Sequence, residues 1–504
     1  MRWTLSITAV SAMTLAASLF AADPVVISMD TQAKGHAVPK TLYGIFFEDI
    51  NFSADGGVYP ELIANRGFDW PVGGWSSSNP RDQRAWTEDF RGGAMARITL
   101  QHGKPVHEAT SGHVRIETFG PGAGCGIRND GFNGIAVKKG AKYDLTFYAR
   151  ALDGYKGGIR VLLETADGRT LCRYDVPNEA MSISPVSKTA NEFILPDWKR
   201  YETVFTAPET VSNAHLSILT DAPGVVELEQ VSLFPQDTFK GRKNGLRKDL
   251  VQLIKDLKPG IMRFPGGCIT EGHDFANWYD WKRSVGDGSL ESRPVNWNRW
   301  GYWQTHGLGY FEYFQLCEDI GAEPLPVVGS GVTCQFWKDH QVAPLDSMPY
   351  FAQNVLDLIE FANGPVDSKW GALRAKMGHP EPFNMKYIGI GNENWDDTYL
   401  DRYFRIQKIV KEKHPEIKVI SSSGPGYGGR TFDHAWSKLN PSNADLVDEH
   451  YYVTADWLLK NTRRYDSYDR KGCKVFPGEY ACNQGPDNGN ILYAALCEAA
   501  MMTG

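Results

Sequence analysis

The order of hydrophobic and polar residues separates the chain into two regions with different periodicities. Between about residues 75 and 234, apolar and polar residues alternate in short segments, such as 113–117, 142–150 and 202–205, separated by Gly, Pro, Asn and Asp. Alternation at a period of two, with a turn about every ten residues, is typical of antiparallel strands. We therefore expect a separate β-sandwich domain in this region.

From residue 244 onward, helices alternate with short buried strands. Residues 246–257 carry apolar side chains at helical spacing, and the apolar run 260–264 that follows ends at Pro265-Gly266-Gly267. The later predicted helices are 311–320, 351–362 and 399–413, and the later predicted strands are 324–329, 385–390, 418–422, 445–451 and 473–478. This alternation indicates parallel βα units, which form either a barrel or a doubly wound sheet.

A (β/α)8 TIM barrel explains this region better than a nucleotide-binding sheet. No GxGxxG motif or P-loop follows any predicted strand. Polar residues instead stand where strands end, namely Arg263, Asn392-Glu393, His450 and Glu479, and barrel enzymes assemble their sites at the carboxyl ends of the strands. Residues 43–48 supply a first strand upstream of the β domain, so seven strands are found and the eighth is missing. The predicted fold is α/β, an incomplete TIM barrel with an inserted β-sandwich.

Composition and charge narrow the functional classes. Of the 504 residues, 42% are hydrophobic and 22% charged, which excludes a disordered, collagen-like or coiled-coil protein. The net charge is −7 and the acidic residues are scattered, so we expect neither nucleic acid nor a membrane surface as a partner. The 15 Trp and 22 Tyr suit the faces of sugars but also occur in large β-rich cores.

The first residues are typical of a targeting segment. Met1-Arg2 precedes the apolar run 3–20, and Ala21-Ala22 follows. We expect a signal peptide over residues 1–22, with cleavage after Ser18 or Ala22, and export to the periplasm or the exterior. A membrane anchor is the alternative, but the run is shorter than about 20 residues and no second apolar span follows.

The expected organisation has four parts. After the signal peptide, residues 23–74 form an N-terminal segment with the first barrel strand. Residues 75–235 form the β-sandwich, which is of a carbohydrate-binding kind, and residues 244–504 form the catalytic barrel.

Eight cysteines are dispersed along the chain, at positions 125, 172, 268, 317, 334, 473, 482 and 497. There is no CxxC pair and no His cluster at metal-ligand spacing, so we expect neither a zinc site nor any other cofactor. Export permits disulfides, but spacing alone does not pair these cysteines.

Two glutamates follow or end predicted strands and carry the candidate chemistry. Glu393 follows the run 388–391, and Glu479 follows the run 475–478 three strands later. Cleavage of a glycosidic bond needs one protonated carboxyl group for the leaving oxygen and one ionised carboxylate for the anomeric carbon. Each glutamate alone is more often a solvated loop residue or an ion-pair partner, but their common placement favours catalysis.

The neighbours of the two glutamates suggest which role each plays. Trp395 near Glu393 is expected to raise the pKa of that carboxyl group by desolvation, whereas Arg263 and a Tyr hydroxyl are expected to keep Glu479 charged. Glu393 is therefore the predicted acid/base and Glu479 the predicted nucleophile. Asn392 is expected to direct its amide at the sugar hydroxyl next to the anomeric carbon.

Several stretches resemble glycoside hydrolase family 51, the α-L-arabinofuranosidases, in the clan of retaining (β/α)8 glycosidases. They are residues 43–51, Asp55-Gly56-Gly57, Asn65-Arg66, 262–267, 391–395 and 478–481. The resemblance covers about residues 25–75 and 244–504, and the inserted β domain looks like the carbohydrate-binding type of longer exported members. It implies net retention, no metal, Glu393 as acid/base and Glu479 as nucleophile.

The resemblance also implies a set of sugar-binding residues. Glu48 binds a hydroxyl group, and Asn392 and Tyr452 line the same subsite; Glu48 has the alternative of pairing with an Arg such as Arg66, and Tyr452 that of a core aromatic. Many members carry Asn directly after Pro-Gly-Gly, whereas this chain has Cys268, which changes one expected hydrogen bond. His450 either braces the site or fills the barrel rim.

The predicted function is the release of terminal non-reducing α-L-arabinofuranosyl residues from arabinoxylan, arabinan or a related hemicellulose. An endo-acting β-glucanase or xylanase of the same clan is the alternative within enzymes, and a non-catalytic carbohydrate-binding fragment is the alternative outside them. An arabinose-containing polysaccharide or oligosaccharide is thus the expected partner. The expected oligomeric state stays open.

The end of the sequence differs from the family pattern. Family members continue through an eighth barrel strand and a C-terminal β-sandwich, whereas this sequence ends in a predicted helix over residues 491–502. We therefore expect it to be a fragment of a longer gene product, and a native stop codon after Gly504 would contradict this expectation.

Eight aromatic residues of the β domain are candidates for stacking on sugar rings: Trp86, Phe132, Tyr143, Tyr148, Tyr155, Tyr174, Trp198 and Tyr201. Aromatics at alternating strand positions more often face the core. We expect two or three of them to be exposed.

Overall fold

The structure is a computed structural model that describes residues 37–70, 85–152, 154–181, 188–189, 192–193, 197–483 and 491–503. The predicted signal peptide lies outside these residues. The chain divides into a short unit, Met1–Leu42, and a large one, Tyr43–Gly504. Within the short unit the structure describes one turn of 3-10 helix, Lys40–Leu42. None of the described helices combines the length and the apolar content needed to cross a membrane.

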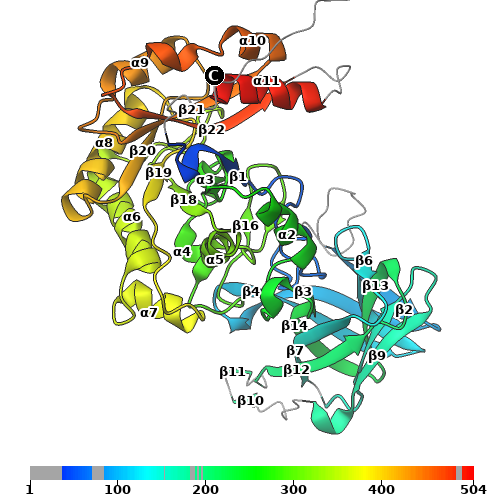
Figure 1. Ribbon diagram of the computed structural model, residues 1–504. Coiled ribbons are helices and arrows are strands. Elements are labelled where there is room, and N and C mark those ends of the chain that lie inside the picture. Colours follow the sequence, from blue (N-terminus) through cyan, green and yellow to red (C-terminus); the bar gives the residue numbers. More distant parts are fainter. Residues whose placement is uncertain are drawn as a thin grey trace, which may run out of the picture. The chain divides into compact units, whose positions relative to one another are not determined.

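Seven parallel strands form the sheet at the centre of the barrel region (Figure 1). In spatial order they are β1 (Gly44–Phe46), β15 (Ile261–Phe264), β18 (Glu323–Val328), β19 (Tyr387–Ile390), β20 (Lys418–Ser422), β21 (Leu446–Val453) and β22 (Lys474–Cys482). Spatial order equals sequence order, and every pair is parallel, as expected when helices connect successive strands. Strands β1 and β22 stand at the two ends of this order.

Helices connect the strands of this sheet, and most of them cover its outside. They are α2 (Lys248–Asp256), α3 (Cys268–Glu271), α4 (Trp281–Val285), α5 (Tyr310–Ile320), α6 (Met348–Asn363), α7 (Lys369–Lys376), α8 (Asp396–Lys413), α9 (Arg430–Lys438), α10 (Ala455–Lys460) and α11 (Ile491–Thr503). Helix α5 ends at Gly321, whose φ of 76° suits glycine. The sequence analysis did not predict α7, α9 and α10; α7 and α10, with eight and six residues, are too short for a clear helical period.

The buried strands explain why this region forms a barrel core. All four residues of β15 are buried, as are three of four in β19 and five of six in β18. Strands buried on both faces need helices on one side and side chains of the other strands on the other. Leu325, Val327 and Ile420 pack together in one such cluster, while Val328 and Ile390 join the larger core under the helices.

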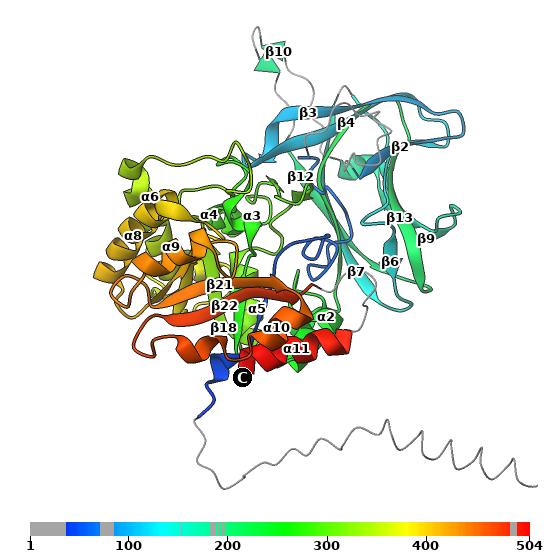
Figure 2. The ribbon, with the colours of Figure 1, turned by 90° about the horizontal axis from the view of Figure 1, so that it is seen from above.

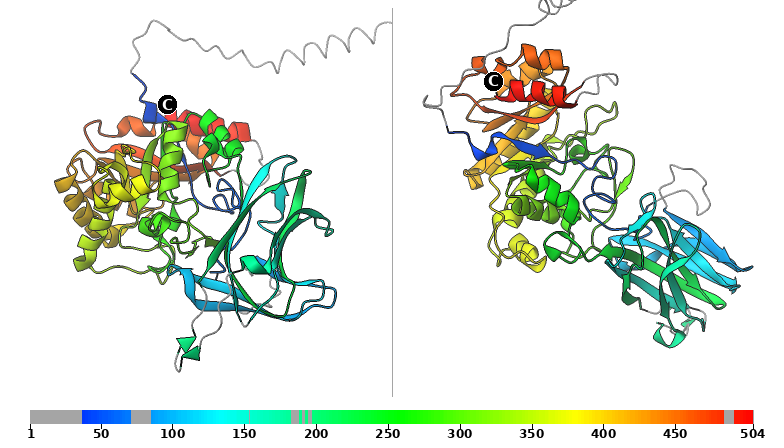
Figure 3. Two further views of the ribbon diagram at one scale, coloured as in Figure 1. Left: turned by 90° about the horizontal axis from the view of Figure 1, so that it is seen from below. Right: turned by 45° about the vertical axis from the view of Figure 1, so that its right-hand side comes forward.

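Two antiparallel sheets form a β-sandwich between β1 and β15 in sequence. One sheet contains, in order, β12 (Lys199–Thr206), β7 (Lys142–Leu152), β14 (Gly224–Pro235), β4 (Thr110–Gly120) and β3 (Met95–His107). The other contains β2 (Trp86–Arg91), β5 (Gly124–Asn129), β13 (Val211–Thr220), β8 (Ile159–Glu164) and β9 (Thr170–Val176), with β6 (Ile135–Val137) paired to β13. Figures 2 and 3 show the two sheets face to face.

The alternation that predicted these strands corresponds to their burial. In β7, buried positions alternate with more exposed ones from Tyr143 to Ala149. The inward residues of both sheets, such as Leu145, Phe147, Leu216 and Ile218, form one core. The predicted incomplete barrel of βα units with a separate β-sandwich is therefore confirmed.

The aromatic candidates of the sandwich divide evenly. Trp86, Tyr143, Tyr155 and Tyr201 are buried in the core. Phe132, Tyr148, Tyr174 and Trp198 are half-buried, and none of the eight reaches the exposed class. The expectation of two or three exposed aromatics is therefore wrong, because these rings lie against neighbouring side chains, as Trp198 does under the guanidinium of Arg150 at 4.1 Å.

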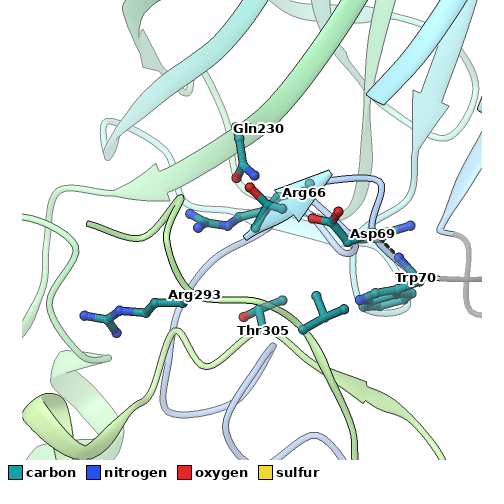
Figure 4. A pocket seen from close by; sticks show the side chains of 10 residues that line it. Arg66, Asp69, Trp70, Gln230, Arg293 and Thr305 are labelled. Carbon is teal, nitrogen blue, oxygen red and sulfur yellow. Dashed lines mark hydrogen bonds between the residues drawn. The ribbon is translucent and has the colours of Figure 1, made fainter. Parts of the chain in front are cut away.

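A polar cavity lies where the segment after β1, strand β14 and the loop before α5 meet (Figure 4). Its labelled side chains are Arg66, Asp69, Trp70, Gln230 and Arg293, with Thr305, and it has room for about one water molecule. Burial raises the pKa of Asp69 to about 7, against hydrogen bonding from Gly112 and the charge of Arg66. The cavity contains neither Glu393 nor Glu479 and is too small for a sugar.

Candidate active site

Glu393 and Glu479 meet at the carboxyl ends of the barrel strands. Their carboxylates, with His450, form a group whose nearest side-chain atoms lie within 4.8 Å of one another. Glu393 follows β19 and Glu479 lies in β22, three strands along the sheet. Both are buried, at 8% and 6% exposure. Glu393 has a φ of 49°, a left-handed conformation that costs on the order of 1 kcal/mol or more in a residue with a side chain and is found often in active sites.

Two hydrogen bonds and a nearby imidazole hold the carboxylate of Glu479. Arg263 Nη1 donates to Oε1 at 2.9 Å, and the Tyr452 hydroxyl donates to Oε2 at 2.8 Å. His450 Nδ1 lies 3.7 Å from Oε2. Charge-assisted hydrogen bonds of this kind stabilise the ionised carboxylate, which is the form a nucleophile needs. The Tyr hydroxyl expected beside Glu479 is that of Tyr452, which is 46% exposed and so does not serve as a core aromatic.

Asn392 has one side-chain atom fixed and one available. Arg263 Nη2 donates to its Oδ1 at 2.6 Å, which sets the orientation of the amide. Its buried Nδ2 makes no hydrogen bond of good geometry among the described residues, although the amide lies close enough to Glu271 to lower the pKa of that carboxyl group. A buried donor without a partner is costly unless a ligand pairs with it. The arrangement fits the predicted bond to a sugar hydroxyl.

His450 joins the two glutamates to Asp448. Its Nδ1 lies 3.0 Å from Glu393 Oε1, and its Nε2 lies 3.3 Å from Asp448 Oδ2. Burial disfavours the imidazolium, but the charges of Glu479 and Asp448 outweigh it and raise the pKa of His450 to about 10. His450 therefore carries a positive charge at neutral pH and braces the site, which was one of its two expected roles.

The free energy of unfolding is expected to fall at alkaline pH because of His450. Its pKa is about 10 in the folded chain and about 6.5 in an unfolded chain, so between these values the folded state holds the extra proton. The stabilisation is complete below about pH 6.5 and is lost as the pH rises through about 10. We expect a loss of at least about 1 kcal/mol between about pH 7 and pH 9.5, measured by urea unfolding.

Two variants test the source of this pH dependence. His450→Asn should flatten the dependence over the same range, even where the variant is less stable at pH 7. His102, which is exposed in the β-sandwich, provides the matched control, and His102→Asn should keep the dependence of the wild type. An unchanged pH dependence in His450→Asn would show that other groups are responsible.

Glu48 lies beside the same site, two residues after β1. Ile269 N–H donates to its Oε1 at 3.2 Å. Burial and the charge of Glu479 raise the pKa of Glu48 to about 7, against hydrogen bonds from Ile269 and Trp300 and the charge of Arg263. The cation that acts on Glu48 is thus Arg263, whereas Arg66 acts on Asp55 and Glu61. Glu48 therefore does not pair with Arg66, which was its alternative role.

The Pro-Gly-Gly segment lets the backbone pass directly under these carboxylates. A Cβ on Gly267 would lie 2.5 Å from Glu479 Oε1, and one on Gly266 would lie 2.4 Å from Glu48 Cγ. Gly266 also has a φ of 152°, which residues with side chains rarely adopt. Glycine is therefore required at position 266, and a side chain at position 267 would displace the carboxylate of Glu479.

Cys268 follows these glycines and lies beside Glu271 and Cys334, two residues that the sequence analysis did not select as site candidates. Its Sγ lies 3.7 Å from Glu393 Oε2. Glu271, on the same short helix α3, and Cys334, in the loop after β18, lie with Cys268 in a group whose side-chain atoms are within 4.8 Å of one another. A hydrogen bond from Cys268, together with Arg299, lowers the pKa of Cys334, while burial and Cys334 raise that of Glu271.

Some other residues of the site could have been predicted from the sequence, and others could not. Asp448 ion-pairs with Arg263 at 3.4 Å and accepts from Gly478 N–H, and it was detectable because it lies two residues before His450 on the same strand face. Nothing in the sequence pointed to Cys334 or Arg299. The ring of Trp395 packs on Phe336 at 5.6 Å, and the side-chain contacts of Glu393 are with His450 and Cys268.

The chain is similar to known α-L-arabinofuranosidases. Residues 253–470 match the family model "Alpha-L-arabinofuranosidase 1 domain". The chain is 41% identical to an extracellular exo-alpha-L-arabinofuranosidase of Streptomyces chartreusis, over 95% of this chain and 55% of that protein. It is 35% identical to alpha-L-arabinofuranosidase 2 of Arabidopsis thaliana, over 93% of this chain and 65% of that protein. The chain thus spans about half to two thirds of the length of these relatives.

A solved structure gives the same relationship in three dimensions. It is an arabinose-bound α-L-arabinofuranosidase of family 51 that is 29% identical, with a TM-score of 0.78 over 94% of this chain and 73% of that one. The similarity covers both the barrel and the β-sandwich, because the two together make up nearly all of the described chain.

Proposed function

We propose that the chain, which is similar to α-L-arabinofuranosidases including one of glycoside hydrolase family 51, belongs to that family and hydrolyses terminal α-L-arabinofuranosyl residues with net retention. The observation that carries the proposal is the approach of the Glu393 and Glu479 carboxylates to within 4.8 Å. Retaining glycosidases hold their two carboxyl groups about 5–5.5 Å apart, whereas inverting ones need about 6.5–9.5 Å to admit a water.

In the first step, Glu479 attacks the anomeric carbon and Glu393 gives its proton to the departing oxygen. Arg263 and Tyr452 both donate to Glu479 and so hold one carboxylate oxygen each in place. The Nδ2 of Asn392 makes no hydrogen bond of good geometry with the described protein and is proposed to bind the neighbouring hydroxyl. The products of this step are a glycosyl ester on Glu479 and the free leaving group.

In the second step, the ionised Glu393 takes a proton from water while the water oxygen attacks the same carbon. The ester bond to Glu479 breaks and the glutamate leaves as a carboxylate. Because each step inverts the anomeric carbon, the product keeps the configuration of the substrate. No metal takes part in either step.

Exo action is favoured over endo action by the floor of the site. Gly267 lies directly against Glu479 and Gly266 against Glu48, and Arg263, Asn392 and Asp448 beside them are buried. We propose that this floor closes the site around one terminal sugar, whereas an endo-acting glucanase or xylanase needs an open cleft. The name of the Streptomyces relative, an exo-alpha-L-arabinofuranosidase, supports the same choice.

Arabinoxylan, arabinan or a related hemicellulose is the proposed source of the terminal sugar. Exposed aromatic rings lie near the site, with Trp300 next to Glu48, and Phe336 against Trp395. Rings of this kind stack on the faces of sugar units beyond the cleaved one. We further propose export of the chain, which its predicted signal peptide and the extracellular Streptomyces relative support.

Product analysis by proton NMR tests the proposal. With an aryl α-L-arabinofuranoside, the first product is expected to be the α anomer of arabinose, before mutarotation supplies the β anomer. With arabinoxylan, arabinose is expected as the sole small product. A β anomer formed first would exclude retention, and xylo-oligosaccharides or gluco-oligosaccharides would favour the endo-acting alternative. A folded chain that binds these polymers but hydrolyses neither substrate would favour the carbohydrate-binding fragment.

A further inference from the structure

Three buried donor groups lie next to the acid/base candidate. Cys268 and Glu271 stand at the two ends of helix α3, and Cys334 comes from the loop after β18. Their Sγ, carboxylate and Sγ atoms lie within 4.8 Å of one another, and their exposures are 9%, 2% and 0%. Residues from a short helix and from a separate loop thus lie close together inside the protein.

This set of atoms fits a cation that prefers sulfur. Zn²⁺ and Cd²⁺ bind Cys thiolates and accept carboxylate oxygens in tetrahedral sites. For three atoms this close, a point exists no more than about 2.8 Å from each, and a small inward movement reaches the usual Zn–S distance of about 2.3 Å. Glu393 Oε2, 3.7 Å from Cys268 Sγ, is in a position to complete the coordination.

The charges around the cluster balance with a divalent cation in it. Two thiolates and the Glu271 carboxylate carry three negative charges. Arg299, which lies beside Cys334, supplies one positive charge, and a divalent cation supplies the other two. Within the part of the chain that the structure describes, Glu271 makes no ion pair with Lys or Arg, although it is 2% exposed. A buried carboxylate in this position needs either a proton or a cation.

A second layer of hydrogen bonds orients the carboxylate. Asn394 Nδ2 donates to Glu271 Oε1. Ser330 Oγ in turn donates to Asn394 Oδ1 at 3.1 Å. Partners that fix a ligand in this way are typical of metal sites and improve their affinity.

From these observations we propose that Cys268, Glu271 and Cys334 form an inhibitory site for a thiophilic divalent cation such as Zn²⁺ or Cd²⁺. A bound cation engages Glu393 and prevents it from giving its proton to the leaving group. The inhibitory part rests on the proposed function, since Glu393 matters only if the chain hydrolyses a glycoside. Binding itself does not depend on that function.

A titration of the reduced chain with Cd²⁺ tests binding directly, through the ultraviolet charge-transfer absorption of Cd²⁺–thiolate bonds. About one high-affinity Cd²⁺ per chain is expected. Cys334→Ser and Glu271→Gln should each weaken this binding by about 100-fold or more. The matched control is Cys473→Ser, because Cys473 is also buried, at 7% exposure, but donates to Ala444 O directly before β22, and it should bind as the wild type does.

Thermal unfolding with and without Cd²⁺ tests binding even where a variant folds poorly. The thermal midpoint of the wild type and of Cys473→Ser should rise with Cd²⁺, whereas that of Glu271→Gln and Cys334→Ser should not. Failure of the reduced wild type, with its thiols counted as free, to bind Cd²⁺ overturns the proposal. Binding of equal affinity in both ligand variants overturns it as well, because the Cd²⁺ then lies elsewhere.

Hydrolysis of an aryl arabinofuranoside tests the inhibition separately. Saturating Cd²⁺ or Zn²⁺ should lower the rate of the wild type by about 10-fold or more, a chelator should restore it, and whatever activity Glu271→Gln retains should resist the metal. Tight binding at the three residues without inhibition would overturn the inhibitory role alone. A chain with no activity before metal is added would contradict the proposed function, and the optical titration would still decide whether the site exists.

Discussion

Replacing Glu479 with alanine is expected to lower kcat/KM for an aryl α-L-arabinofuranoside by about 10⁴-fold or more. The variant lacks the carboxylate that forms the glycosyl ester, and the donors Arg263 and Tyr452 lose the charge to which they bind. The binding of arabinose should change much less, because Glu48 and Asn392 remain. Initial rates and the dissociation constant of arabinose measure the two effects separately.

Azide distinguishes a lost nucleophile from a damaged fold. The anion is small enough for the space that the carboxylate leaves in Glu479→Ala, and it should restore turnover while giving an arabinosyl azide of inverted configuration. Glu449→Gln is the matched control, because Glu449 is a fully buried glutamate of the neighbouring strand that bonds to Trp436 and Tyr468 outside the site. It should keep activity within a few-fold of the wild type, and equal rates in Glu479→Ala and the wild type would disprove the mechanism.

Replacing Glu393 with glutamine is expected to slow hydrolysis by an amount that depends on the leaving group. Loss of general-acid catalysis costs about 10²–10⁴-fold for a sugar or alkyl leaving group, which needs the proton. A dinitrophenolate leaves without protonation, so the first step should be nearly as fast as in the wild type. The glycosyl ester should then accumulate, because Glu393 is no longer present to activate water, and a burst of dinitrophenolate should be seen.

Glu48→Gln provides the control for this comparison. Glu48 lies beside Glu479 and is proposed to bind a sugar hydroxyl, so its loss should affect both kinds of leaving group alike. A plot of rate against leaving-group pKa should be steep for Glu393→Gln and unchanged in slope for Glu48→Gln. Equal slopes in the two variants would remove Glu393 from the acid/base role.

The local pattern of the sequence was sufficient to predict the elements of the barrel. Helix α5 begins one residue before its predicted start and ends where predicted, and β20 has the predicted bounds. Helices α6 and α8 each begin three residues earlier than predicted. Neither helix has a side-chain cap that would mark its start, and the first turn is where a helix boundary is least certain from periodicity.

The sequence also predicted which side chains would meet at the site, because the rule is topological. Side chains at the carboxyl ends of parallel strands point to one edge of the sheet, so Arg263, Glu393, His450 and Glu479 were expected there, and the structure brings them together. The same reasoning located Asn392, whose Oδ1 accepts a hydrogen bond from Arg263 Nη2. The roles of these residues in catalysis are what the variants above test.

By itself, then, the sequence determined the alternation of strands and helices, the β-sandwich, and the placement of both glutamates at one edge of the barrel. Only the tertiary structure decided that Cys334 reaches Cys268 and Glu271, and that His450 stands between three carboxylates. The physical reason is that the first set depends on local sequence patterns, whereas the second depends on contacts between segments far apart in the sequence. Periodicity records which face of an element is buried, whereas the meeting of two loops depends on the register of every strand between them, which no local pattern records.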